Sequence, residues 1–183
     1  TNGTQFPEQA PEIWRHFKTV EIAFSIDDLG PRFEYQRTNA VWTEVETNIA
    51  KFVELRRQHT NIQLQVCSTV NVFNVAYLEE LSHWIEHQQF DFVYWNMLHE
   101  PAYFSIASLP SNAKSVIELH LTTCVVPEEF QAEFKRIVDF MRRGQSTDGS
   151  DMLRRMRELD ALRSQNLGQV APELAGIIGY DKT

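Results

Sequence analysis

The feature that most constrains the fold is an alternation between β-rich runs and helix-length amphipathic segments in the first 95 residues. Residues 20–26, 62–72 and 90–95 are rich in β-branched and aromatic side chains, which favours strands. Between them, residues 43–58 and 76–87 carry apolar side chains at helical spacing. This order predicts parallel strands joined by right-handed helical crossovers, and therefore an α/β fold. The periodicity fits a barrel and an open sheet equally well.

The rest of the chain is expected to be mainly helical. Residues 113–123 follow a Ser-Asn pair that can cap a helix, and a last helix is expected over residues 151–163. The stretch 144–150 (GQSTDGS) has the composition of a flexible linker. We therefore divide the chain into an α/β part, residues 1–110, and a helical C-terminal extension, residues 111–183.

Composition narrows the classes of function. Seventeen Lys and Arg against twenty-five Asp and Glu give a formal charge of -8, which argues against broad binding to nucleic-acid phosphates. A basic cluster near the C-terminus, with Glu158 and Asp160 interleaved, is expected to be a solvated helix face. Its arginines are Arg154, Arg155, Arg157 and Arg163.

No apolar run is long enough to predict a membrane span.

Cysteine usage indicates the compartment. The two cysteines, Cys67 and Cys124, cannot make a disulfide framework, and their apolar neighbours predict buried structural thiols. With no signal peptide visible, the expected location is the cytoplasm.

Polar side chains follow each predicted strand. Ser25 and Asp27 end the first strand, Asn71 and Asn74 the second, and Asn96 the third. Ligand sites of parallel α/β sheets lie at the carboxyl ends of the strands. We therefore expect these side chains to converge on one open edge of the sheet.

Short motifs occur in order along almost the whole chain. They are Thr1-Asn2-Gly3-Thr4, Ser25-Ile26-Asp27, Arg37, Thr69-Val70-Asn71 with Asn74, Asn96-Met97-Leu98, Leu159-Asp160 with Arg163, and Pro172-Glu173-Leu174. This series resembles the radical S-adenosylmethionine (SAM) superfamily, and in particular its members with a twitch extension. The motifs are similar to that family's turn after the third barrel strand, the ends of strands four to six, and the tail.

The resemblance implies a partial (β/α)6 barrel that contains the last three parallel strands and binds SAM at their ends. Ser25 and Arg37 would hold polar groups of the methionine or ribose, and Asp27 would accept hydrogen bonds from ribose hydroxyls or the SAM amino group. Asn71 and Asn74 would contact the adenosine. The cofactor-binding set is Ser25, Asp27, Arg37, Asn71, Asn74, Asn96 and Leu98.

The family also binds a 4Fe–4S cluster through a CxxxCxxC loop, which this sequence lacks. The chain is therefore expected to be the C-terminal half of an enzyme whose other half holds the cluster and generates a 5′-deoxyadenosyl radical. Alone, it should be inactive and bind SAM weakly. The substrate, a peptide, a nucleotide or a metabolite, is left open. An unpaired edge beside residues 20–26, and exposed Phe24, Val66 and Phe92, should make the isolated chain self-associate.

Two other interpretations remain. His83, Glu86 and His87 match the H-x-x-E-H motif of zinc hydrolases, although a solvated helix face explains the same residues. The missing cluster motif instead favours a non-catalytic α/β binding module. Sequence upstream of Thr1 would distinguish a module from part of a longer enzyme.

Overall fold

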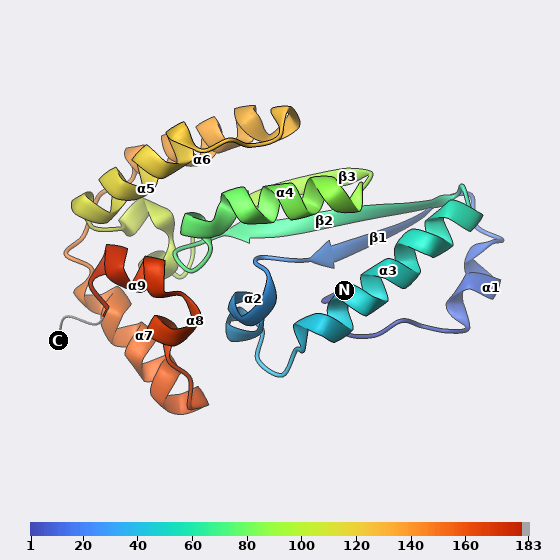
Figure 1. Ribbon diagram of the computed structural model, residues 1–183, viewed down its shortest axis with the longest axis horizontal. Helices are drawn as coiled ribbons and strands as arrows, with labels where there is room; N and C mark the ends of the chain where they lie inside the picture. The colour runs from blue at the N-terminus through green and yellow to red at the C-terminus, as the bar shows by residue number, and fades with distance from the viewer. Residues whose placement is uncertain (181–183) are drawn as a thin grey trace. The chain divides into compact units, whose positions relative to one another are not determined.

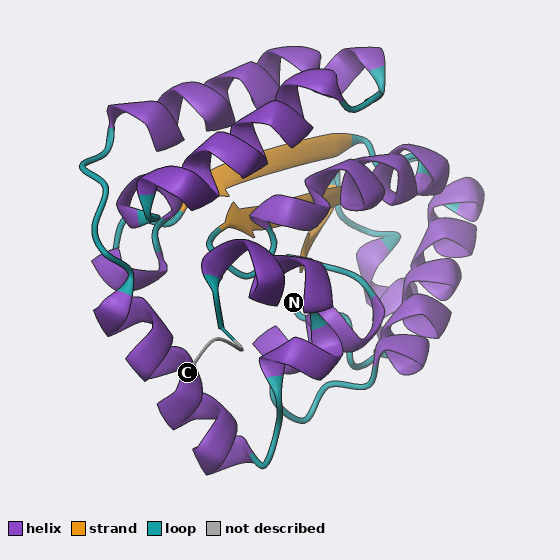
Figure 2. Ribbon diagram, turned by 60° about the vertical axis from the view of Figure 1, so that its left-hand side comes forward, coloured by secondary structure: helices purple, strands orange, loops and turns teal. Residues whose placement is uncertain are grey.

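The computed structural model describes residues 1–180 (Figure 1). The strands lie within the first 97 residues, separated by helices, and the elements that follow are helices. Figure 2 distinguishes the strands from the helices by colour. The strands are β1 (Val20–Ser25), β2 (Ile62–Val70) and β3 (Phe92–Met97). The α-helices are α1 (Ala10–Trp14), α2 (Gly30–Gln36), α3 (Trp42–Gln58), α4 (Leu78–Gln88), α5 (Ser111–Thr123), α6 (Gln131–Arg143), α7 (Ser150–Arg163), α8 (Leu167–Val170) and α9 (Pro172–Ile178), and the 3-10 turns are η1 (Val75–Tyr77), η2 (Ala102–Phe104), η3 (Ile106–Ser108) and η4 (Glu128–Phe130).

The three strands form one parallel sheet in the order β1-β2-β3. β1 pairs with β2 in register from Val20 opposite Ile62 to Ser25 opposite Cys67. The prediction of adjacent parallel strands joined by helices is therefore confirmed. Closure of such strands into a barrel stays a prediction.

The third strand begins two residues later than predicted, and Asp91 accounts for the shift. Its backbone nitrogen donates to the carbonyl of Leu64, and its carboxylate accepts the Leu64 N–H at 2.7 Å. Gln89 has a positive φ of 55°, and its carbonyl accepts a hydrogen bond from Arg56. The chain is therefore still turning at residues that the sequence assigned to the strand.

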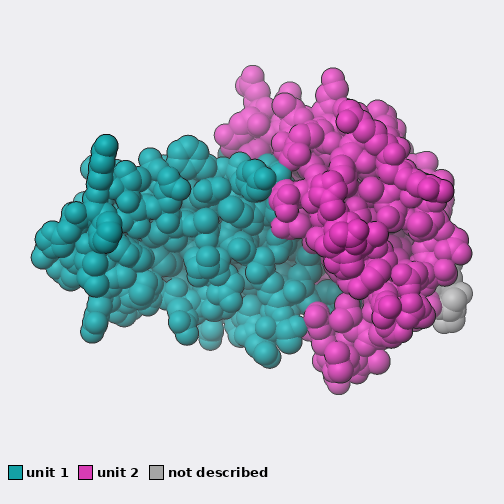
Figure 3. All heavy atoms as spheres, turned by 180° about the vertical axis from the view of Figure 1, so that it is seen from behind, with its two compact units in different colours: residues 1–68, 84–95 teal, residues 69–83, 96–183 magenta. Residues whose placement is uncertain are grey.

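The chain separates into two compact units, coloured in Figure 3. The first contains residues 1–68 and 84–95, and the second contains residues 69–83 and 96–183. This partition interleaves segments of the chain, and the domain boundary expected at residue 110 stays a prediction.

The core of the first unit is a chain of aromatic contacts between β1 and its helices. Phe24 of β1 meets Phe52 of α3 edge-to-face at 5.2 Å between ring centroids. It also lies 6.0 Å from Phe90, which packs against Trp84 of α4, and Trp84 meets Trp42. Both crossover helices therefore cover the same face of the sheet, as the right-handed crossover rule requires.

The other face of the sheet carries the more exposed side chains. Side chains alternate along all three strands between buried and more exposed positions. Phe24 and Val66, expected to be exposed, are fully buried, because the apolar set of side chains faces the helices. The opposite set is mainly polar, with Phe92 and Tyr94 51% and 58% exposed. In the first unit this set is Glu21, Ala23, Ser25, Gln63, Gln65, Cys67, Phe92 and Tyr94.

The edge of β1 is not bare, contrary to the expectation. The backbone nitrogen of Thr1 donates to the carbonyl of Ala23, and the carbonyl of Thr1 accepts from Ser25, each at 2.8 Å. Gly3 turns the segment away with φ of 77°, and Asn48 of α3 donates to its carbonyl. These contacts pair the carboxyl-terminal end of the β1 edge and leave its amino-terminal end open.

Helix α2 lies between residues 26 and 43, where the sequence analysis predicted neither a helix nor a strand. Pro31 occupies the first turn, where a missing N–H costs nothing. The Asp28 carboxylate, 1% exposed, accepts hydrogen bonds from the Leu29 N–H and from Arg32 at 2.9 Å. The Gly-Pro pair therefore both ends the strand segment and begins a helix.

The second unit is built around α5, which packs against α6 and α9. Its interior holds Lys114, whose ammonium group donates to the carbonyls of Ala107 and Gly144 at 2.7 and 2.9 Å. Burial lowers the pKa of this lysine. The helix therefore ties the η3 turn to the loop after α6.

That loop, residues 144–150, was expected to be a flexible linker. Instead, the backbone N–H and the hydroxyl of Thr147 both donate to the carbonyl of Ser108, at 3.2 and 2.7 Å. A Cβ on Gly144 would lie 2.3 Å from the carbonyl oxygen of Ala107. Close packing and hydrogen bonds therefore hold the loop in place, and the linker interpretation is wrong.

Candidate functional site

The carboxyl end of β1 carries three of the predicted SAM-binding residues. Ser25 is the last residue of the strand, and Asp27 follows two residues later. Arg37 caps the end of α2, and its guanidinium forms an ion pair of 2.5 Å with Asp27 and lies over the ring of Phe33. The unforeseen helix α2 is therefore what returns Arg37 to the end of β1.

This group offers both hydrogen-bond donors and hydrogen-bond acceptors. The Asp27 carboxylate accepts, the Arg37 guanidinium donates, and the Ser25 hydroxyl can do either. The side chains of Asp27 and Arg37 are 13% and 28% exposed. Such a set suits the ammonium and carboxylate of an amino acid or the hydroxyls of a ribose.

The loop after β2, in the second unit, uses its two asparagines to shape its own backbone. The Asn71 side chain accepts from the Phe73 N–H and donates to the Thr69 carbonyl. Asn74 accepts from the Asn71 N–H and donates to the same Thr69 carbonyl at 2.9 Å. These local bonds give both amides a structural role, with Asn74 1% exposed.

The remaining predicted ligands lie on β3 and its exit. Asn96 is exposed between buried Trp95 and Met97, and Leu98 is half-buried with its N–H bonded to the Val70 carbonyl at 3.0 Å. Asn71, Asn74, Asn96 and Leu98 belong to the second unit, whereas Ser25, Asp27 and Arg37 belong to the first. Their convergence stays a prediction.

The H-x-x-E-H motif lies on α4, and all three of its side chains are exposed. His83 Nε2 is 2.8 Å from the carbonyl oxygen of Val125. None of the three motif residues takes part in a cluster of three metal-ligating side chains within residues 1–180. The solvated-face interpretation therefore fits His83, Glu86 and His87 better than a zinc centre of their own.

A different cluster combines Glu79, His120 and Cys124, all half-buried and all in the second unit. Their ligand atoms lie within 4.8 Å of one another, and Glu79 Oε2 is 3.7 Å from His120 Nε2. Glu79 stands in the first turn of α4. His120 is in the last turn of α5, and Cys124 caps that helix.

The environment of Cys124 disfavours a bare thiolate. Burial raises the pKa of the thiol, and the nearby negative charge of Glu79 raises it further. The thiol is half-buried rather than fully buried, as is Cys67. The expectation of two buried cysteines is therefore wrong for both.

A cavity of about 620 Å³ adjoins this cluster, with Cys124 in its wall. Leu121, Phe134 and Val138 supply apolar surface, while Arg142 supplies charge and pairs bidentately with Glu118. Hydrogen bonds from Arg142 lower the pKa of Glu118. The full lining is Leu121, Thr122, Cys124, Val125, Val126, Gln131, Phe134, Lys135, Val138, Asp139 and Arg142.

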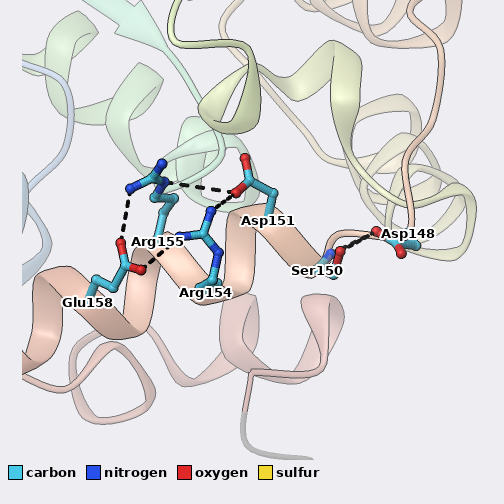
Figure 4. Close-up of polar contacts among 6 residues, drawn as sticks. All are labelled: Asp148, Ser150, Asp151, Arg154, Arg155 and Glu158. Atoms are coloured by element: carbon cyan, nitrogen blue, oxygen red, sulfur yellow. Dashed lines mark hydrogen bonds and ion pairs between the residues drawn. The ribbon is translucent and has the colours of Figure 1, made fainter.

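Two of the basic residues of α7, Arg154 and Arg155, are engaged in ion pairs on their own helix, as Figure 4 shows. Arg154 pairs with Asp151 and with Glu158, and Arg155 pairs with Glu158 at 3.1 Å. Hydrogen bonds from Arg154 lower the pKa of Glu158. Asp160, expected on the solvated face, is instead 6% exposed and accepts from the Leu167 N–H.

Sequence reasoning missed the Glu79–His120–Cys124 cluster, although a histidine and a cysteine four residues apart can share one helix face. Among the described residues, no helix is long and apolar enough to cross a membrane. Comparisons with protein-family models, curated proteins and solved structures gave no match to this chain.

Proposed function

We propose that this chain supplies the C-terminal half of a radical SAM-like barrel and binds SAM through the side chains that follow β1. The observation that carries the proposal is a consecutive parallel sheet with helices on one face and a mainly polar, more exposed opposite face. In a (β/α) barrel the helices lie outside the strands, so the face without these helices would be the one that faces the barrel interior.

Ser25 lies on that more exposed face, one residue after the buried Phe24. At the end of the strand, the Asp27–Arg37 pair holds the guanidinium in place. In the proposed site Arg37 meets the carboxylate of the methionine moiety, and Asp27 accepts hydrogen bonds from the amino group or the ribose. Because Asp27 and Arg37 already form an ion pair, neither charge is left unpaired before the ligand binds.

The chain does not by itself fit an iron–sulfur cluster. Its sequence has two cysteines, Cys67 and Cys124, and they belong to different units. A radical SAM cluster needs three thiolates, so another part of the enzyme would hold the cluster.

The first test concerns the gene. The reading frame upstream of the codon for Thr1 should encode a β-rich run followed by CxxxCxxC. A stop codon or an unrelated domain in that place would refute the barrel proposal and would favour the binding module.

The second test uses the chain itself, followed by two-dimensional NMR during titration with SAM. We expect weak binding, with Kd of about 1 mM or more, and amide shifts confined to Ser25–Asp27 and Arg37. Arg37→Ala should abolish these shifts, whereas Arg56→Ala, which removes an arginine bound to Gln89 and Asp91, should preserve them. Shifts that survive Arg37→Ala, or their absence at saturating SAM, would contradict the proposed site.

A further inference from the structure

We propose that Glu79, His120 and Cys124 form a zinc-binding site between α4 and α5. The three side chains come from two helices of one unit and offer a carboxylate, an imidazole and a thiol at one point. The site is independent of the proposed SAM site, with which it shares no residue.

The geometry is close to that of a tetrahedral centre. Zinc bonds of about 2.1 Å to nitrogen or oxygen and 2.3 Å to sulfur place ligand atoms about 3.4 to 3.7 Å apart. The Glu79–His120 separation is 3.7 Å, and all three ligand atoms lie within 4.8 Å of one another. The His120 and Glu79 side chains are 41% and 34% exposed, so complete burial fixes neither of them in place.

The ligand types select the ion. Calcium and magnesium prefer all-oxygen sites, whereas one sulfur, one nitrogen and one oxygen are a donor set typical of zinc. Three protein ligands leave a fourth position for water. Since Cys124 also lines the 620 Å³ cavity, a small ligand in the cavity could reach this region.

A contact beside the cluster supports its position. His83 lies one helical turn after Glu79 on α4, and its Nε2 is 2.8 Å from the Val125 carbonyl. This contact joins α4 to the residue that follows Cys124. The cysteine is therefore held near Glu79 by a second link between the same two segments.

Calorimetric titration of the chelator-treated full chain with zinc chloride tests the proposal. We expect one zinc ion per chain and a loss of affinity of at least about tenfold in Cys124→Ser and in His120→Asn. Cys67→Ser is the matched control, because it removes the other half-buried cysteine and should leave zinc binding unchanged. Cobalt(II) should give a thiolate charge-transfer band in the parent and in Cys67→Ser but not in Cys124→Ser.

Two results would overturn the assignment. One is the absence of stoichiometric zinc binding by a folded parent chain. The other is zinc binding that survives Cys124→Ser but disappears in His87→Asn, which would place the ion on the H-x-x-E-H motif. Glu79→Gln changes the third proposed ligand while keeping the size and shape of this partly exposed side chain. Circular dichroism of each variant distinguishes lost zinc binding from lost folding.

Discussion

Gly144 is a position where one added methyl group should cost considerable stability. A Cβ there would lie 2.3 Å from the carbonyl oxygen of Ala107 and 2.5 Å from its Cβ. Ordinary non-bonded contacts are about 3.5 Å, so the two backbones would have to separate by about 1 Å. The carbonyl of Gly144 also accepts from the buried ammonium of Lys114 at 2.9 Å, and such a separation would break that bond.

These two effects give the magnitude of the prediction. Overpacking costs about 1 to 3 kcal/mol, and loss of one buried hydrogen bond costs about 1 kcal/mol more. Gly144→Ala should therefore lower the free energy of unfolding by about 2 to 4 kcal/mol, which corresponds to a fall in Tm of roughly 4 to 16 °C for a chain of this size.

Gly176→Ala is the matched control. Gly176 lies in α9, and a Cβ there would meet nothing within 4 Å. Alanine should stabilise this helix by about 0.5 to 1 kcal/mol. Thermal unfolding followed by circular dichroism measures both variants, and a Gly144→Ala protein that melts at or above the parent Tm would refute the close-packing argument.

Three further predictions concern other groups. Lys114→Met should cost about 1 to 3 kcal/mol, because two partly buried carbonyls lose their donor. Burial lowers the pKa of Lys114 in the folded chain. In the alkaline range between that lowered pKa and the ordinary lysine pKa, the unfolded chain therefore binds more protons than the folded chain. Urea titrations should show that the stability of the parent relative to Lys114→Met rises with pH across this range and is constant below it. Tyr180→Phe, which removes a hydroxyl donor to buried Asp160, should lower stability by about 1 to 2 kcal/mol in the same assay, and an unchanged transition midpoint would show that this bond contributes nothing. Replacing Phe92 and Tyr94 together by glutamate should reduce the expected self-association in sedimentation velocity, and a parent chain that sediments as a sharp monomer would contradict that expectation.

The sequence predicted the order and direction of the strands because their signals are local. Each β-rich run is short, and each crossover segment is long enough for one helix. Helix α2 escaped prediction because Gly30-Pro31 reads equally as the end of one segment and as the start of a helix. What decides between them is the buried carboxylate of Asp28, whose contacts with Leu29 and Arg32 exist only once the chain has turned.

The error over Phe24 and Val66 has a different origin. The alternation in β1 and β2 divides the side chains into an apolar and a polar set, and burial assigns the apolar set to the helices. The expectation instead started from the barrel, and it treated loss of the opposite wall as exposure of the apolar side chains. Hydrophobicity alone would have given the correct face.

The cluster of Glu79, His120 and Cys124 marks where sequence reasoning ends. The spacing of His120 and Cys124 is visible in the sequence, but the same spacing occurs on many helices that bind nothing. A third ligand from α4 is what makes the pair chemically distinctive, and only the packing of the second unit brings Glu79 to 3.7 Å from His120. The H-x-x-E-H motif, in contrast, is conspicuous in the sequence and gathers no cluster of three metal-ligating side chains in the described part of the chain. The search for chemistry in this protein is therefore best directed at the contact between α4 and α5, where the proximity of these groups was not visible as a motif.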